Sequence, residues 1–227
     1  MGKTELRVLG AVVLGAAVAL AITACTGLGP AEAASDGKPI TAPVSVVKFD
    51  VPTGGVHVRV EDGAPVSIRR ELKFSGTKPV GDSHHVEGGA LVLNGCGDGC
   101  AVNYDVVVPA ALPVSGHVGT GSVVLDRAAS ADVRTTTGGI DVHGVSGTVR
   151  AEARTGDVRT AQTKPGAVYA AAQTGSVTVT VPPSTYRVTA EARTGRVDLR
   201  IPNTPSAADT VEAHAGTGSV TVTPAAN

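Results

Sequence analysis

The sequence is very poor in aromatic residues: it has no Trp, two Phe and three Tyr among 227 residues. Large rings fill thick protein cores, so this chain must build its core from small aliphatic side chains in layers that lie close together. It also lacks a bias in charge, because acidic and basic residues are interspersed and the formal net charge is −1. Nucleic-acid binding uses a basic face, commonly with stacking aromatics, so the composition argues against it.

Long apolar runs are missing after residue 24, and nothing later is long enough to cross a bilayer. Before that point Lys3 and Arg7 precede an uncharged stretch that ends in Ile22-Thr23-Ala24-Cys25. This ending resembles the lipobox of bacterial lipoproteins. Residues 1–24 are therefore predicted to be a lipoprotein signal peptide, and Cys25 the lipidated residue that anchors the chain at the extracytoplasmic face of the cell membrane. A plain secretory signal and an uncleaved membrane helix are the alternatives.

Residues 25–43 show no hydrophobic periodicity and consist mainly of Gly, Ala, Ser and Pro. Such a composition is typical of a flexible tether. We expect the folded part of the chain, residues 44–227, to stand off the membrane on this segment.

A short phrase, Thr-Gly, any residue, then Val or Ile, recurs six times in the second half of the chain. Successive glycines of the phrase are 17, 18, 19, 20 and 23 residues apart. Repetition with a period near 20 residues is the signature of a stacked repeat protein. The copies begin at Thr120, Thr137, Thr155, Thr174, Thr194 and Thr217.

Alignment of the copies gives apolar columns separated by polar ones, the period-two pattern of half-buried strands. The column four residues before the Thr holds mostly Ala, and the column after the turn holds only Val or Ile. Each repeat is thus a strand, a Thr-Gly corner, a second strand and a loop. We predict an all-β, single-domain β-solenoid of stacked coils of about 17–20 residues, with a β-sandwich as the alternative. Coils are expected to stack in chain order.

The first half of the folded part is less regular. Thr53-Gly54-Gly55-Val56 is an earlier copy of the corner, and residues 102–108 have a strong strand pattern. We predict that residues 44–113 form an irregular beginning of the solenoid and residues 114–223 its regular part. A separate small β domain over 44–113 is the alternative.

Cysteines are scarce, and the two that follow the lipobox, Cys96 and Cys100, lie in a Gly-rich loop. In an oxidising compartment two such residues favour a disulfide. A zinc site that adds His84 and His85 is the alternative, but adjacent residues of a strand point in opposite directions. The disulfide is expected to close one loop rather than to hold the fold, and no metal site is predicted.

No catalytic motif stands out. In chain-order stacking, Asp141 and Asp198 would share an outward column three coils apart, on the order of 14 Å, which is too far for paired carboxylates in glycoside cleavage. The best local candidate for a base is His143 beside Asp141. Exposed Asp and His on a strand usually serve solvation, and a catalytic site needs several convergent groups. We therefore predict no enzyme activity, no catalytic residues and no cofactor.

Arginines gather in two repeats and offer a possible face for an anionic ligand: Arg150, Arg154, Arg193 and Arg196. In chain-order stacking Arg154 and Arg193 would share a column with only Gln173 between them. Acidic residues lie among these arginines, so a solvated wall of mixed charge is the alternative interpretation. Tyr169 and Tyr186 are expected at or near outward positions, where they could stack on a sugar.

Repeated units such as Thr-Gly-Ser-Val-Thr-Val after a lipobox resemble the bacterial putative-adhesin domain family, a domain of unknown function. That resemblance covers roughly residues 44–223 and implies a β-solenoid without known catalytic residues. We predict a non-catalytic envelope lipoprotein that binds or scaffolds at the cell surface, with an envelope protein or an anionic polymer as possible partner. A carbohydrate-active β-helix enzyme and an accessory or sensor protein of an envelope-stress system are the alternatives.

Overall fold

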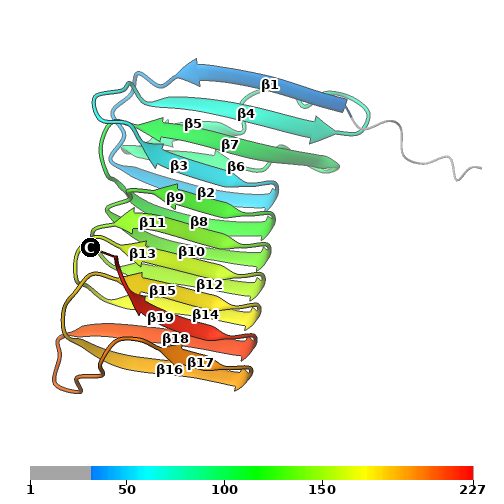
Figure 1. Cartoon of the computed structure of the whole chain (residues 1–227). Helices are drawn as coiled ribbons and strands as arrows, with labels where there is room; N and C mark the ends of the chain where they lie inside the picture. The colour runs from blue at the N-terminus through cyan, green and yellow to red at the C-terminus, as the bar shows by residue number, and fades with distance from the viewer. Residues whose placement is uncertain (1–31, 227) are drawn as a thin grey trace, which may run out of the picture.

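The computed structural model describes residues 32–226, which form nineteen β-strands and no helix within that range. Two sheets face each other as a long, two-layered stack (Figure 1). Sheet A has ten strands, in the order β1 (Glu32–Pro39), β4 (Ser67–Phe74), β7 (Cys100–Val108), β3 (Val56–Val60), β9 (Val123–Asp126), β11 (Ile140–Val145), β13 (Val158–Gln162), β15 (Val177–Val181), β19 (Val220–Pro224) and β17 (Val197–Leu199).

Sheet B has nine strands, in the order β16 (Tyr186–Thr194), β18 (Asp209–Thr217), β14 (Val168–Thr174), β12 (Val149–Thr155), β10 (Ser130–Thr137), β8 (Pro113–Thr120), β2 (Val46–Thr53), β6 (Ala90–Asn94) and β5 (His84–Glu87). Each Thr-Gly corner joins a strand of sheet B to the next strand of sheet A, and equivalent strands pair in parallel. The predicted β-solenoid is confirmed, and its cross-section has two faces.

The core lies between the sheets and is thin, as the scarcity of aromatics predicts. Val133, Ala151, Ala170 and Ala213 occupy one inward column of four adjacent strands and are fully buried. Gly116 breaks this column because the ring of Phe49 on the neighbouring strand β2 occupies the space that a side chain there would need. Small inward residues therefore set the separation of the layers.

The corner glycines adopt a backbone conformation that favours glycine. Gly138 has a φ of 132°, in the region that L side chains rarely adopt. A Cβ at Gly138 would overlap the carbonyl oxygen of Gly121 in the next coil, and the other corners repeat this approach. Gly138 N also donates to the carbonyl oxygen of Thr155 at 2.7 Å, which links the corners of successive coils.

The expectation that coils stack in chain order is wrong at both ends. Strands β18 and β19 are inserted between β14–β15 and the coil β16–β17, so the last coil in sequence is not the last in space. The loop between β17 and β18 allows this return, and the 23-residue step from Gly195 to Gly218 is the longest of the repeat. The end of the stack is therefore β16–β17 (Figure 1).

The first half also departs from simple stacking. Strands β2 and β3 pair directly with β8 and β9, while residues 61–112 supply the next coil, β6–β7, and cover it with antiparallel strands. Both halves thus share both sheets, which excludes a separate β domain over 44–113. We call β1, β4 and β5 the cap.

The predicted flexible tether is wrong for residues 32–39, which form β1 antiparallel to β4 along its whole length. The composition of this segment did not indicate a strand, because most of its side chains are exposed and its order comes from backbone pairing with β4. The signal segment and Cys25 lie outside the described residues. In the part of the chain that the structure describes, no helix is long and apolar enough to cross a membrane.

Candidate functional site

The outer face of sheet B contains a shallow hollow over Ala171. Register places Ala171 of β14 between Glu152 of β12 and His214 of β18, so a methyl group lies in a row of longer polar side chains. The hollow has a volume of about 420 Å³. We call it the Ala171 hollow and define it by its polar rim: His117, Arg134, Glu152, Arg154, Gln173 and His214.

Charges around the Ala171 hollow are only partly compensated. Arg134 Nε and Arg150 Nη2 lie 3.2 and 2.5 Å from the same oxygen, Oε1 of Glu152. Arg154 is exposed and makes neither an ion pair nor a side-chain hydrogen bond within residues 32–226. Glu152 pairs with two other guanidinium groups, those of Arg134 and Arg150. The positive charge of Arg154 at the rim is therefore not compensated.

An aromatic side chain stands beside this charge. Tyr169, two residues before Ala171 on β14, is half-buried, and the Arg150 guanidinium carbon lies 4.3 Å from its ring centroid. The His214 ring lies 5.8 Å from the same ring at an angle of 43°. A stacked cation and a tilted imidazole hold the tyrosine ring in place next to the hollow. The expectation for Tyr169 is confirmed.

The expectation that Tyr186 lies at or near an outward position is wrong. Tyr186 is 1% exposed, and its hydroxyl donates to the carbonyl oxygen of Pro182 at 2.9 Å. The ring is buried at the beginning of β16, where the chain turns into the strand after Pro182 and Pro183. It cannot stack on a ligand.

The four arginines do not form one face. Arg150 and Arg154 belong to β12, where Arg154 lines the Ala171 hollow and Arg150 pairs with Glu152 of its rim. Arg193 and Arg196 lie on the terminal coil. The insertion of β18 places Gly216 as well as Gln173 between Arg154 and Arg193. Of the four arginines predicted to form one face for an anionic ligand, only Arg150 and Arg154 therefore lie near each other.

Sheet A also carries polar groups on its outer face. His57 of β3 lies 2.8 Å from Asp126 of β9 through Nε2 and 3.8 Å from Asp105 of β7 through Nδ1. His143 Nε2 lies 2.7 Å from Asp141 Oδ1 on β11. The sequence did not predict the His57 cluster, because its members come from three strands that are separated by irregular insertions. The correct stacking order places Asp141 and Asp198 four coils apart rather than three.

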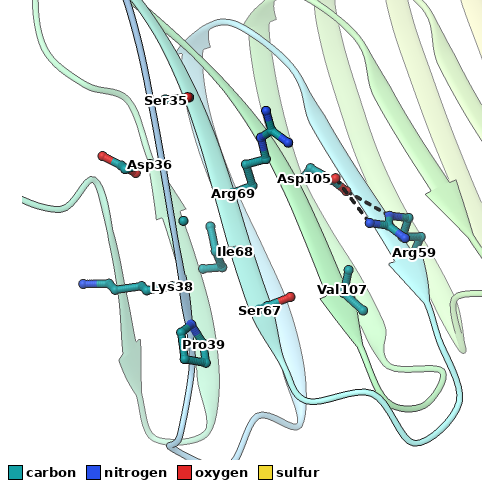
Figure 2. Close-up of a pocket in the computed structure, with 11 residues that line it drawn as sticks. Ser35, Asp36, Lys38, Pro39, Arg59, Ser67, Ile68, Arg69, Asp105 and Val107 are labelled. Atoms are coloured by element: carbon teal, nitrogen blue, oxygen red, sulfur yellow. Dashed lines mark hydrogen bonds and ion pairs between the residues drawn. The ribbon is translucent and has the colours of Figure 1, made fainter.

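A second groove, of about 570 Å³, crosses the cap on the outer face of sheet A (Figure 2). Small residues on β1 and β4, among them Ser35 and Ser67, form its floor. Its cations are paired: Arg59 donates to Asp105 at 3.1 Å, and Arg69 lies 3.7 Å from Glu71. This groove offers less free charge to an anionic ligand than the Ala171 hollow.

Cys96 and Cys100 form a disulfide with a Cα–Cα separation of 5.6 Å. His84 is buried and His85 exposed on β5, so they point in opposite directions as the strand geometry predicts. Among residues 32–226 no group of three or more His, Cys, Asp or Glu side chains is placed to hold a metal ion.

The fold and these faces define an all-β solenoid with shallow polar surfaces. Residues 115–225 match the model of the family described as Toastrack DUF4097. No curated protein matches the sequence.

Solved structures share the architecture at low identity. A crystal structure described as a "putative cell adhesion protein" from Clostridium sporogenes ATCC 15579 is 13% identical, with a TM-score of 0.51, and the match covers 86% of this chain and 100% of that chain. A "putative adhesin" from Bacteroides fragilis NCTC 9343 is 10% identical, with a TM-score of 0.39, and covers 86% and 97% of the two chains. The first of these matches supports the two-sheet fold.

Proposed function

We propose that the protein is a non-catalytic, lipid-anchored module of the cell envelope that binds an anionic polymer at the Ala171 hollow. The observation that carries this proposal is Arg154, an exposed and unpaired cation beside a hollow that Tyr169 flanks. A guanidinium group recognises carboxylates and phosphates through paired, charge-assisted hydrogen bonds. An aromatic ring next to it can pack on the apolar face of a sugar.

The shape of the hollow supports binding along a chain rather than enclosure of a small molecule. Pockets for small ligands usually bury most of the ligand surface. The Ala171 hollow is an open depression on a sheet face, and the polar rows continue along the stack on both sides of it. A polymer can lie across such a face and contact several coils.

The experiment measures binding of the purified chain to polygalacturonate, polyphosphate and uncharged dextran at low and high salt. We expect Arg154→Ala to weaken binding to an anionic polymer by roughly tenfold or more, the usual scale for a charged hydrogen-bonding group. Arg187→Ala is the matched control, because Arg187 is an exposed arginine of the same sheet, on β16, and does not line the hollow. Equal losses in both variants would indicate general charge attraction and would contradict a site at the hollow.

The anchoring part of the proposal rests on Ile22-Thr23-Ala24-Cys25 and has its own test. We expect metabolic labelling with a fatty acid to mark the protein and Cys25→Ala to abolish the label and release the protein from membranes. Unchanged membrane association of the unlabelled Cys25→Ala variant would favour the uncleaved membrane helix instead.

A further inference from the structure

The two ends of the stack differ. At one end β1, β4 and β5 form the cap, and β1 exposes almost all of its side chains. At the other end no strand formed by residues 32–226 lies beyond the coil β16–β17 (Figure 1). Val197 and Leu199, at inward positions of β17, are 45% and 40% exposed there, although the equivalent Val220 and Val222 of β19 are fully buried.

Beyond the beginning of β16, the outer backbone edge of this coil also has no partner strand among the described residues. Val220 N donates to Arg196 O and Arg200 N to Val222 O, so the polar groups of the intervening Val197 and Leu199 point away from β19. On β16 the same alternation directs Ala190 and Ala192 outward. The segment after β17 covers only the beginning of β16, where Asn203 Oδ1 accepts from Val188 N at 3.0 Å and Thr204 N donates to Tyr186 O at 2.8 Å.

We propose that two copies of the chain associate end to end through this open coil, β16 with β16 and β17 with β17, around a twofold axis. In this arrangement the strands of the two copies run antiparallel, and Ala192 and Val197 each pair with the same residue of the other copy. The backbone N–H and C=O groups of both residues point to the open edge, so they can form these hydrogen bonds. Ala192 and Val197 are equally distant from the Thr194–Gly195 corner, so one axis satisfies both strands.

Charge complementarity selects this register. When Ala192 of one copy pairs with Ala192 of the other, Glu191 of each copy faces Arg193 of the other copy. With Val197 opposite its copy, Arg196 faces Asp198 in the same way. A register centred on Glu191 or Asp198 would instead place like charges opposite each other. The chosen register joins residues 190–199 and leaves the contact of Asn203 with β16 undisturbed.

A second copy explains the open end better than other occupants. Head-to-tail stacking lacks matching columns, because the opposite end consists of β1 and β5, which pair antiparallel to their neighbours and not in the register of the repeat. Strand β1, with which the described part of the chain begins, lies in that cap at the opposite end of sheet A from β17. A copy of the same coil supplies matching edge strands, apolar side chains that cover Val197 and Leu199, and the complementary charges.

The test is sedimentation of the full chain over a range of concentrations, with hydrogen exchange of the β17 amides. We expect a reversible dimer with affinity in the micromolar range, as is usual for small interfaces, and slower exchange of the Val197 and Leu199 amides at high concentration. Val197→Lys should abolish the dimer and leave the melting temperature of the monomer unchanged, since this side chain is already exposed.

A charge swap separates the proposed register from general adhesion of edges. Glu191→Arg should weaken the dimer about tenfold, because it creates two repulsive pairs, and addition of Arg193→Glu should restore it. A chain that stays monomeric at the highest concentration would overturn the proposal. A dimer that is insensitive to Val197→Lys and to the charge swap would also overturn it. Slow hydrogen exchange of β17 at every concentration would do the same, because it would show that another part of the same chain covers this strand.

Discussion

Arg70 of β4 and Asp36 of β1 form a two-pronged ion pair, in which Nε and Nη2 donate to the two carboxylate oxygens at 2.7 and 2.6 Å. The Arg70 side chain is only 6% exposed, and it also donates to Ser83 Oγ at 3.0 Å. This pair fastens β1, the outermost strand of sheet A, to the interior of the cap.

Asp36→Ala is therefore expected to loosen the cap. It leaves a buried guanidinium group without its main partner, at a cost of about 1–3 kcal/mol in the free energy of unfolding. Hydrogen exchange should show faster opening of β1 and β4, while β10 and β12 remain protected. Glu71→Ala is the control, because it removes an exposed carboxylate of the same strand β4, which lies 3.7 Å from Arg69. Equal effects of the two substitutions would contradict the assignment.

The cap should also lose stability in acid in two steps. Burial lowers the pKa of His84 below its ordinary value of 6.5, and neither ring nitrogen has a hydrogen-bond partner among residues 32–226. The hydrogen bond from Arg70 lowers the pKa of Asp36 below 3.8. Both groups bind protons more weakly in the folded state, so their contributions are complete above these ordinary values and decline as the pH falls below them.

His84→Leu should remove the first step. We expect thermal unfolding of this variant to be nearly independent of pH between about 7 and 5, where the unchanged protein loses stability. His85→Gln, on the exposed side of the same strand, should behave like the unchanged protein. The charged groups near His84, which include Asp82, Arg70 and Lys38, stay the same in both variants. A retained pH dependence in His84→Leu would exclude His84 as its source.

A corner glycine should tolerate no side chain. Gly138→Ala combines a φ of 132° with overlap of the new Cβ and Gly121 O, so we expect a loss of about 2–4 kcal/mol. Gly63→Ala is the matched control: its φ is 76°, but a Cβ there meets no atom within 4 Å. It should cost only about 1–2 kcal/mol. Denaturant melts of the two variants measure the difference, and equal losses would show that contact between coils is unimportant.

Reduction of the Cys96–Cys100 disulfide should have a local effect. The bridge closes a very short loop, which limits its stabilisation to about 2 kcal/mol. We expect faster hydrogen exchange at the ends of β6 and β7 and unchanged protection of β12 and β14. Cooperative unfolding of the whole stack on reduction would show that this bridge holds more than its own loop.

Sequence patterns predicted the corners, the inward columns and the two-strand repeat, because these depend on local requirements such as the positive φ of Gly138. They did not predict which coils are neighbours. Val177 offers an equivalent surface to Val197 and to Val220, so parallel pairing of identical columns carries no information about order. The long step before Gly218 was the only signal of the inserted coil.

The same limit applies to the candidate site. Arg150 and Arg154 were placed correctly because one strand contains both, whereas the position of Arg193 depended on stacking order. The hollow itself arises where Ala171 replaces a longer side chain between Glu152 and His214. Both the hollow and the His57 cluster depend on which strands are neighbours, and the sequence pattern does not determine that.

The insertion of β18–β19 between β14–β15 and β16–β17 makes the position of the terminal coil dependent on strands that follow it in the sequence. During synthesis or export, β16 and β17 emerge before the strands on which they rest in the finished stack. Until residues 209–224 follow, β16–β17 has only β14–β15 to stack on, and the inward columns of those two coils match. Synthesis of residues 209–224 is thus itself a condition for forming the observed order of coils, and molecules that lack these residues should not show it.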